Sequence, residues 1–119
     1  SLADAGRLSE AGRAYLFQFR DNSTFMDNTN EWYAEGVAPE IQHLQNLPAA
    51  MFPWLMANLR AGNVIHIADV SQMPAEAAVE KLEFEKRGIK AILILPVHAG
   101  RELVGFVGFD SVVAPDPWQ

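Results

Sequence analysis

Residues 88–112 of the 119-residue chain read GIKAILILPVHAGRELVGFVGFDSV, and this stretch decides the fold. Two apolar runs, 90–98 and 102–112, flank a short turn that contains Gly100. Apolar runs joined by so short a turn predict a β-hairpin. The first run is apolar at every position from Ala91 to Leu95, which is typical of a strand covered on both faces. The sequence therefore predicts a sheet with layers above and below it.

A second hairpin is predicted upstream. Residues 14–20 alternate, with Tyr15, Phe17 and Phe19 on one face and polar side chains on the other. The turn-forming residues 21–23 follow, and residues 25–33 resume an extended pattern that stops before Gly36. We expect these two segments to pair as antiparallel strands.

The middle of the chain favours short helices. Prolines and apolar residues spaced three or four apart predict helical segments within 37–62, most clearly from Pro53 to Arg60 with Gly62 after its end. Residues 64–70 predict a short strand. A further helix is expected from Pro74 to a stop at Gly88. We expect its buried stripe to comprise Ala75, Ala78, Val79 and Leu82, and its outer face to comprise Glu76, Glu80, Glu83 and Lys86.

The order strand, strand, helical stretch, strand, helix, strand, strand predicts the α+β class with a mostly antiparallel central sheet. An apolar content of 50% over 119 residues supplies one core, so a single domain is expected over residues 1–119.

Composition excludes several functions. A formal net charge of -6 opposes nucleic-acid binding, which depends on clustered Lys and Arg. The absence of cysteine excludes disulfides, thiolate zinc sites and a catalytic thiol. The apolar runs are too short to cross a bilayer, and the N-terminus lacks the pattern of a secretion signal. We expect a cytoplasmic chain without direct membrane contact.

Residues 13–110 resemble the GAF domain family, especially the members attached to bacterial sensor kinases and cyclic-di-GMP enzymes. The resemblance rests on six segments in the family's order: RAYLFQF (13–19), NTNEW (28–32), FPW (52–54), VIHIADV (64–70), GIKA (88–91) and GFVGFD (105–110). It implies a GAF-like (profilin-like) fold with five or six antiparallel strands, helices on one face, and a small-molecule pocket under helices and loops on the other.

The resemblance also implies flanking helices that pack together and often dimerise. Only residues 2–12 are available for the first helix, and nothing after Trp118 supplies the last, so we expect a domain truncated at its terminal helices. We accordingly expect a homodimer in the full-length protein, formed through these helices.

A pocket is expected where aromatic and amide side chains converge. Asn28, Asn30 and Trp32 share strand parity and would give a planar ligand amide groups and an aromatic wall. The alternative is that Trp32 belongs to the core and the asparagines satisfy loop backbone. The residues expected to line the pocket are Phe17, Phe19, Asn28, Asn30, Trp32, Phe52, Trp54, His66 and Ile94.

Catalytic and metal sites are not expected. His66 and Asp69 lie three apart, but three scattered histidines lack the short fixed spacing of metal ligands. In domains of this family the Asp69 position looks structural, ending the strand and bonding the next turn. Gly105 and Gly108 lie inside an apolar strand, so they favour close packing over phosphate binding. Covalent bilin attachment and the family's methionine sulfoxide reductase chemistry both require cysteine, and the cyclic-nucleotide motif of the family is missing.

Three function classes follow. The first is a sensory module that binds an unknown small molecule within a multidomain bacterial signalling protein. The second is a ligand-free dimerisation and relay module. The third, an enzyme, has only His66 and Asp69 to support it. We expect no resident cofactor, and an output domain such as a histidine kinase or diguanylate cyclase elsewhere in the parent protein.

Overall fold

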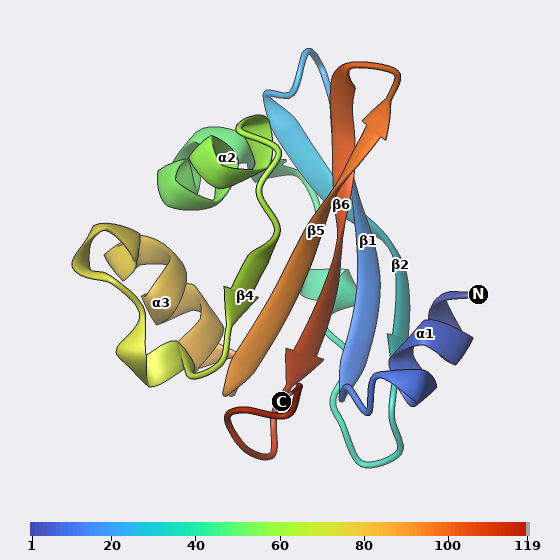
Figure 1. Ribbon diagram of the computed structural model, residues 1–119. Coiled ribbons are helices and arrows are strands. Elements are labelled where there is room, and N and C mark those ends of the chain that lie inside the picture. Colours follow the sequence, from blue (N-terminus) through green and yellow to red (C-terminus); the bar gives the residue numbers. More distant parts are fainter. Residues whose placement is uncertain (119) are drawn as a thin grey trace.

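The computed structural model describes residues 1–118 and contains a six-stranded sheet with helices on both faces (Figure 1). The strand order is β3-β2-β1-β6-β5-β4, and every neighbouring pair is antiparallel. The strands are β1 (Arg13–Arg20), β2 (Phe25–Tyr33), β3 (Leu47–Pro48), β4 (Ile65–Ile67), β5 (Ala91–Ala99) and β6 (Glu102–Ser111). The helices are α1 (Leu2–Leu8), α2 (Pro53–Arg60) and α3 (Ala78–Lys86), with 3-10 turns at Ile41–His43, Ala49–Met51, Val70–Gln72 and Ala75–Ala77. The predicted α+β class and antiparallel sheet are confirmed.

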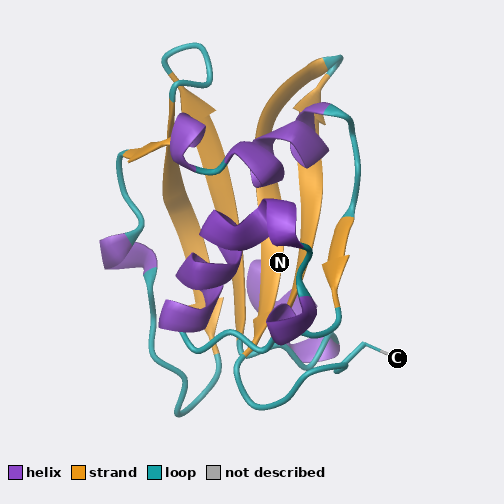
Figure 2. Cartoon of the chain, turned by 90° about the vertical axis from the view of Figure 1, so that its left-hand side faces the viewer, coloured by secondary structure: helices purple, strands orange, loops and turns teal. Residues whose placement is uncertain are grey.

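The two faces of the sheet are covered unequally. Helices α2 and α3 lie over one face, and α1 lies on the other (Figures 1 and 2). The main core fills the space beneath α2 and α3, and it includes Phe17, Ile92 and Phe106 from the sheet and Leu59 from α2. On the opposite face a Cβ added to Gly6 would lie 2.2 Å from the ring of Trp32, so glycine lets α1 rest directly on that ring. None of the helices within residues 1–118 has the length and apolar character needed to span a bilayer.

The β5–β6 hairpin forms as predicted, but burial of β5 on both faces was predicted wrongly. Ile92 and Ile94 are 1% exposed beneath the helices, whereas the side chain of Leu95 on the other face is 36% exposed. Helix α1 has only seven residues and packs against β1 and β2, so it does not reach β5. The apolar run is therefore buried fully on one side only.

Helix α3 presents a different face to the core from the one predicted. Val79 and Leu82 are 50% and 57% exposed, whereas Glu80 is completely buried and Phe84 packs against the core. The first residues after Pro74 form a 3-10 turn, and the α-helix begins only at Ala78. Ala77, Glu80 and Phe84, spaced three and four apart, thereby form the inward stripe.

The buried carboxylate of Glu80 has a structural partner in α2. Its Oε2 accepts a hydrogen bond of 3.1 Å from the backbone N–H of Leu55, in the first turn of α2. Phe52 precedes α2 and gives it no side-chain cap, so Glu80 satisfies one of the N–H groups that a helix start leaves free. Its Oε1 has no hydrogen-bond partner within the described residues. A carboxylate on one helix thus holds the start of the other.

The predicted ends of both helices are confirmed. Gly62 and Gly88 have φ values of +77° and +69°, the left-handed conformation that glycine adopts without steric cost. After α3, the N–H of Ile89 donates to the carbonyl of Phe84 over 3.0 Å, and the Ile89 side chain is buried. This closure turns the chain from α3 directly into β5.

We predict that Glu80→Ala lowers the free energy of unfolding by about 1–3 kcal/mol, because it leaves the buried N–H of Leu55 without an acceptor. Glu80→Gln keeps an acceptor oxygen and should lose less. The control Glu85→Ala, at an exposed position of the same helix, should change stability by no more than about 0.5 kcal/mol. Urea unfolding measures all three, and equal effects of Glu80→Ala and Glu85→Ala would refute the inward orientation of Glu80.

A second prediction compares neighbouring positions of β5. Ile94→Asp should abolish folding, because an unpaired buried carboxylate costs several kcal/mol against a net stability of roughly 5–15 kcal/mol. Leu95→Asp should remain folded, because its side chain reaches solvent. Thermal melting followed by circular dichroism distinguishes the two variants. A cooperative melt for Ile94→Asp with loss of folding in Leu95→Asp would show that Leu95, and not Ile94, faces the core.

Candidate functional site

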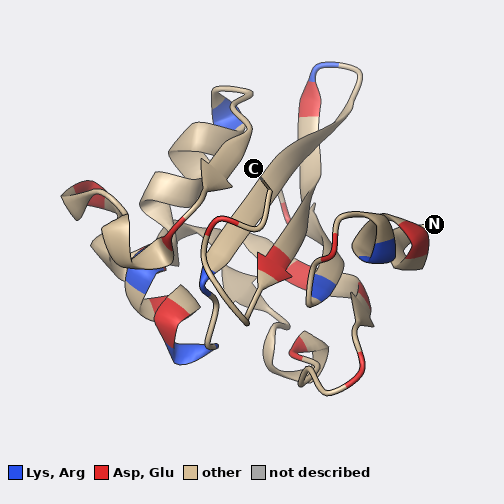
Figure 3. Cartoon of the chain, turned by 60° about the horizontal axis from the view of Figure 1, so that its bottom comes forward, with Lys and Arg blue, Asp and Glu red and all other residues tan. Residues whose placement is uncertain are grey.

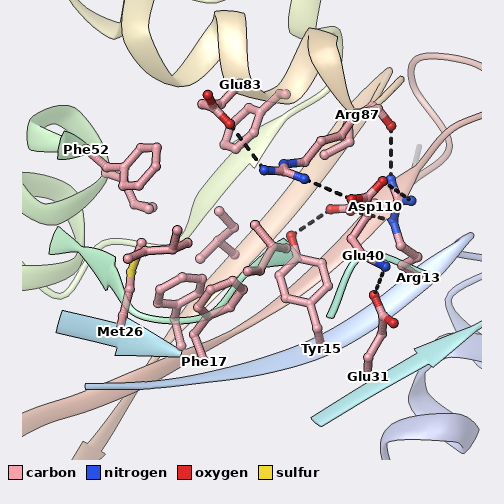
Figure 4. A pocket seen from close by; sticks show the side chains of 17 residues that line it. Arg13, Tyr15, Phe17, Met26, Glu31, Glu40, Phe52, Glu83, Arg87 and Asp110 are labelled. Carbon is pink, nitrogen blue, oxygen red and sulfur yellow. Dashed lines mark hydrogen bonds and ion pairs between the residues drawn. The ribbon is translucent and has the colours of Figure 1, made fainter. Parts of the chain in front are cut away.

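A cavity of about 70 Å³ lies between the sheet and the layer formed by α2, α3 and the segment 34–47 (Figure 4). Its wall is mostly apolar, and charged residues gather at one end. The apolar lining residues are Phe17, Met26, Leu44, Leu47, Phe52, Leu55, Phe84, Ile89, Ile94 and Phe106. The polar lining residues are Arg13, Tyr15, Glu31, Glu40, Glu83, Arg87 and Asp110.

The apolar floor is rigid because it stands on paired strands. Phe17 of β1 and Phe106 of β6 are directly opposite each other in the register, and their rings stack with centroids 4.7 Å apart. Tyr15 meets Phe17 edge to face at 5.7 Å. These aromatic contacts fix the sheet side of the cavity.

A buried group of three polar side chains forms the inner part of the charged end. Nε of Arg13 donates to Oδ2 of Asp110 over 3.1 Å, and the Tyr15 hydroxyl donates to Oδ1 over 2.6 Å. Tyr15 lies flat over Gly108, where an added Cβ would come within 2.2 Å of the Tyr15 ring. The prediction that this glycine permits close packing is therefore confirmed, and the packing places the hydroxyl on Asp110.

Burial governs the protonation of this group. Loss of hydration raises the pKa of Asp110 to about 6, although the hydrogen bond from Tyr15 and the charge of Arg13 act in the opposite direction. Burial, followed by the neighbouring Asp110 charge, raises the pKa of Tyr15 well above its usual value. The phenol therefore acts as a donor, and the carboxyl group keeps its proton to a higher pH than an exposed aspartate does.

The outer part of the charged end joins the segment 34–47 to α3. Glu40 accepts from Nη1 of Arg87 over 2.8 Å and lies 3.7 Å from Nη1 of Arg13. Arg87 also contacts Glu83 at 3.4 Å. The carboxylate of Glu31 accepts the backbone N–H of Glu40 over 2.9 Å, as Figure 4 shows. These contacts join the segment 34–47 to α3 at the solvent side of the cavity.

The bulge in β2 separates residues that were expected to lie together. Leu16 pairs with Asn30 and Phe17 with Asn28, so an extra residue interrupts the alternation. Asn28 and Asn30 consequently lose their common face, and Trp32 packs under Gly6 of α1 on the far side of the sheet. The expectation that Asn28, Asn30 and Trp32 share one space is wrong for this reason.

Asn28 has a structural role in this bulge. It is 1% exposed, and the amide orientation that satisfies the surrounding backbone places its nitrogen 2.8 and 3.1 Å from the carbonyl oxygens of Asn30 and Leu16. This is the alternative in which asparagine satisfies irregular backbone. Neither Asn28 nor Asn30 lines the cavity.

Of the other predicted pocket residues, Phe17, Phe52 and Ile94 line the cavity, and Phe19 does not. Trp54 and His66 instead border a separate hollow of about 440 Å³ beside the edge strand β4. Trp32 and Trp54 therefore lie on opposite sides of the sheet. The expectation that both side chains line one pocket is wrong. The binding roles of all these residues remain predictions.

Asp69 is structural, as the resemblance implied. Its Oδ1 accepts from the backbone N–H of Ser71 at 3.0 Å and from the Ser71 hydroxyl at 2.7 Å. His66 is exposed, and its ring lies 6.2 Å from that of Trp118. Within residues 1–118, no three His, Asp or Glu side chains are grouped closely enough to hold a metal ion.

Sequence reasoning missed the charged end of the cavity. Alternate residues of a strand lie on one face. The shared parity of Arg13 with Tyr15 and Phe17 could therefore have placed Arg13 on the cavity side of the sheet. Asp110 ends the segment GFVGFD, and nothing in that segment indicates a buried partner for its carboxyl group. Glu40 and Arg87 are 47 positions apart in the chain, and no local pattern connects them.

The pKa of Asp110 gives a test of this buried group. Because its folded-state pKa of about 6 lies above the ordinary aspartate value of 3.8, folding favours the protonated carboxyl. Its stabilising contribution should be complete below pH 4 and decline as pH rises through 6, by on the order of 3 kcal/mol. The difference in unfolding free energy between the wild type and Asp110→Asn measures this decline. A difference that rises with pH would show that Arg13 dominates the titration instead.

One sequence relative is the methanogenesis regulatory histidine kinase FilI of Methanothrix harundinacea (strain 6Ac). It is 30% identical over 110 residues, which make up 89% of this chain and 12% of the kinase. The chain thus corresponds to a small part of that relative's length.

Solved structures with this fold include the phycocyanobilin-bound GAF domain of a cyanobacterial phytochrome, with a TM-score of 0.79, 19% identity, and coverage of 95% of this chain and 67% of that one. The photoproduct state of GAF3 from Slr1393 of Synechocystis sp. PCC6803 has a TM-score of 0.76 and 22% identity, over 99% of this chain and 77% of that one. At these identities the likeness shows the fold alone. The family model described as GAF domain matches residues 1–119, and the chain therefore belongs to the GAF domain family.

Proposed function

We propose that this GAF domain is a sensory module that binds a small molecule in the cavity between its sheet and α3. The supporting observation is the cavity itself, with an apolar wall and charged groups at one end. Apolar walls with a few oriented polar groups are typical of small-molecule sites. The domain binds and relays a signal, and catalysis belongs to other parts of the protein that contains it.

The size of the cavity restricts the ligand. Sites for drug-sized ligands usually measure about 300–1,000 Å³. The 70 Å³ present here would suit a molecule of a few heavy atoms unless the segment 34–47 moves outward. A bilin, which one structural neighbour carries, is far larger, and the chain has no cysteine to anchor it.

The parent protein is proposed to be a multidomain signalling protein with a histidine kinase output. This rests on the kinase relative, in which the matching region is 12% of the length. The expectation of a diguanylate cyclase output finds no support in that relative. We further propose that the parent dimerises through helices flanking the domain. Ligand binding would then shift the relative pose of these helices through different affinities for two states.

Charge distribution is consistent with a small-molecule partner. The formal net charge is -6, and Figure 3 shows Lys and Arg segments scattered among acidic ones. Nucleic-acid binding depends on clustered basic residues, so this distribution disfavours it.

A ligand-free relay module is the second candidate. It is favoured by the internal pairing of the charged end, where both oxygens of Asp110 already accept hydrogen bonds. A domain of this kind would need no occupant to complete its polar contacts.

We predict that the protein purified from cells carries a small molecule, detectable as added mass by native mass spectrometry. Leu44→Trp should remove it, because Leu44 lines the cavity and a larger side chain fills the space. Leu103→Trp is the matched control, since Leu103 is also partly buried against the core but lies outside the cavity. An unliganded wild type that binds no metabolite would favour the relay module.

A further inference from the structure

Glu40 lies between two arginines at the charged end of the cavity. Its two carboxylate oxygens lie toward two different arginines, with Oε2 at 2.8 Å from Arg87 and Oε1 at 3.7 Å from Arg13. One carboxylate therefore bridges a cation from β1 and a cation from the end of α3. Arginine is well suited to this geometry, because its planar fork presents several donors to carboxylate oxygens.

The other carboxylates of the cavity have hydrogen-bond or ion-pair partners of their own. Glu31 accepts the backbone N–H groups of Glu40 and Ile41. Glu83 contacts Lys86 and Arg87, and both oxygens of Asp110 are occupied by Tyr15 and Arg13. A ligand can therefore reach the charged end only by exchange with a group already there.

Glu40 is the member most readily exchanged. Asp110 stands on a central strand and Glu83 on a helix, whereas Glu40 lies in the irregular segment between β2 and β3. That segment is held near its ends, where the N–H of Ala34 bonds to Gly12 and the N–H of Asn46 bonds to Asp27. Its backbone is also held in the middle by Glu31, which accepts the N–H groups of Glu40 and Ile41. The carboxylate of Glu40 contacts only Arg13 and Arg87 among the described residues, so an outward turn of this side chain would free both arginines while the backbone stays in place.

An outward turn of Glu40 would uncover the arginines on the solvent side of the cavity. The solvent side of the cavity is formed by half-buried residues of this segment and of α3, and the Arg87–Glu40 contact joins them. If Glu40 turns away, Arg87 and Arg13 both lose its carboxylate, while Arg13 keeps the carbonyl of Ala38 at 2.8 Å. Arg13 is 2% exposed, so the side of its guanidinium that faces Glu40 would then need a replacement acceptor.

We propose that the ligand is a small carboxylate with an apolar tail, and that its carboxylate replaces that of Glu40 across Arg13 and Arg87. This inference rests on the proposed sensory function. The tail would lie along the apolar wall near Phe17 and Phe52. Exchange of one carboxylate for another leaves the net charge at this end unchanged. A cationic ligand in the same place would instead be repelled by the positive charges of Arg13 and Arg87.

The test uses three probes with the same alkyl tail and different head groups, namely butanoate, 1-butanol and butylamine. Each is titrated into the ¹⁵N-labelled protein at pH 7 and constant ionic strength, and backbone and Arg Nε–H signals are followed by NMR. Butanoate should bind the wild type more tightly than the other two, with shifts at Arg13 and Arg87. This comparison requires no variant.

Variants then identify the exchanged group. Glu40→Gln should bind butanoate about tenfold more tightly than the wild type, because the competing internal carboxylate is gone. Glu35→Gln, at an exposed position of the same segment, should bind like the wild type. Arg87→Gln should lose the preference for butanoate over 1-butanol, whereas Arg60→Gln on the exposed side of α2 should keep it.

The outcomes separate this inference from the proposed function. Tighter binding of 1-butanol or butylamine in the cavity would overturn the carboxylate ligand and leave a small-molecule sensor intact. Unchanged butanoate affinity in a folded Glu40→Gln protein would overturn the exchange. If no probe binds and the purified wild type carries no small molecule, both proposals fail.

Discussion

The buried guanidinium of Arg13 connects the three parts that make up the cavity. It donates to Asp110 of β6, to the carbonyl of Ala38 in the segment above, and to the carbonyl of Arg87 after α3, at 3.1, 2.8 and 3.2 Å. A buried charge is tolerated only when its donors are satisfied, because desolvation is costly. The sheet, the covering segment and the end of α3 must therefore keep their relative positions for Arg13 to remain buried.

Much of the fold could be predicted because its signals are local. Helix α2 has the predicted bounds, and both hairpins form within one or two residues of the expected limits. Proline at the first turn and glycine after the last residue act through the backbone of their own segment. The buried face of helix α3 was predicted wrongly because it depends on a tertiary partner. Glu80 turns inward to accept the N–H of Leu55, and two aliphatic side chains, Val79 and Leu82, are left exposed. No periodicity within the helix contains that information.

The candidate site was predicted less well for a related reason. Phe17, Phe52 and Ile94 were found because aromatic and apolar residues on the inner faces converge in any such sheet. Trp32 was misplaced by a single inserted residue in β2, which moves each later side chain to the opposite face. The charged end depends on pairs such as Arg87 and Glu40, which become neighbours only when the chain is folded. Their sequence separation leaves no pattern to detect.

The same contacts that make the closed state stable also give a route from the cavity to the rest of the molecule. Glu80 ties α3 to the start of α2, and Arg87 ties the end of α3 to the covering segment. A ligand that displaces Glu40 would change the contacts of Arg87 at one end of α3. Coupling requires that the two states differ in affinity for the ligand, and removal of an internal competitor supplies such a difference. Fold similarity to photoreceptor domains does not carry their ligand with it, because the chemistry of the cavity is set by side chains such as Arg13 and Glu40 and not by the sheet that holds them.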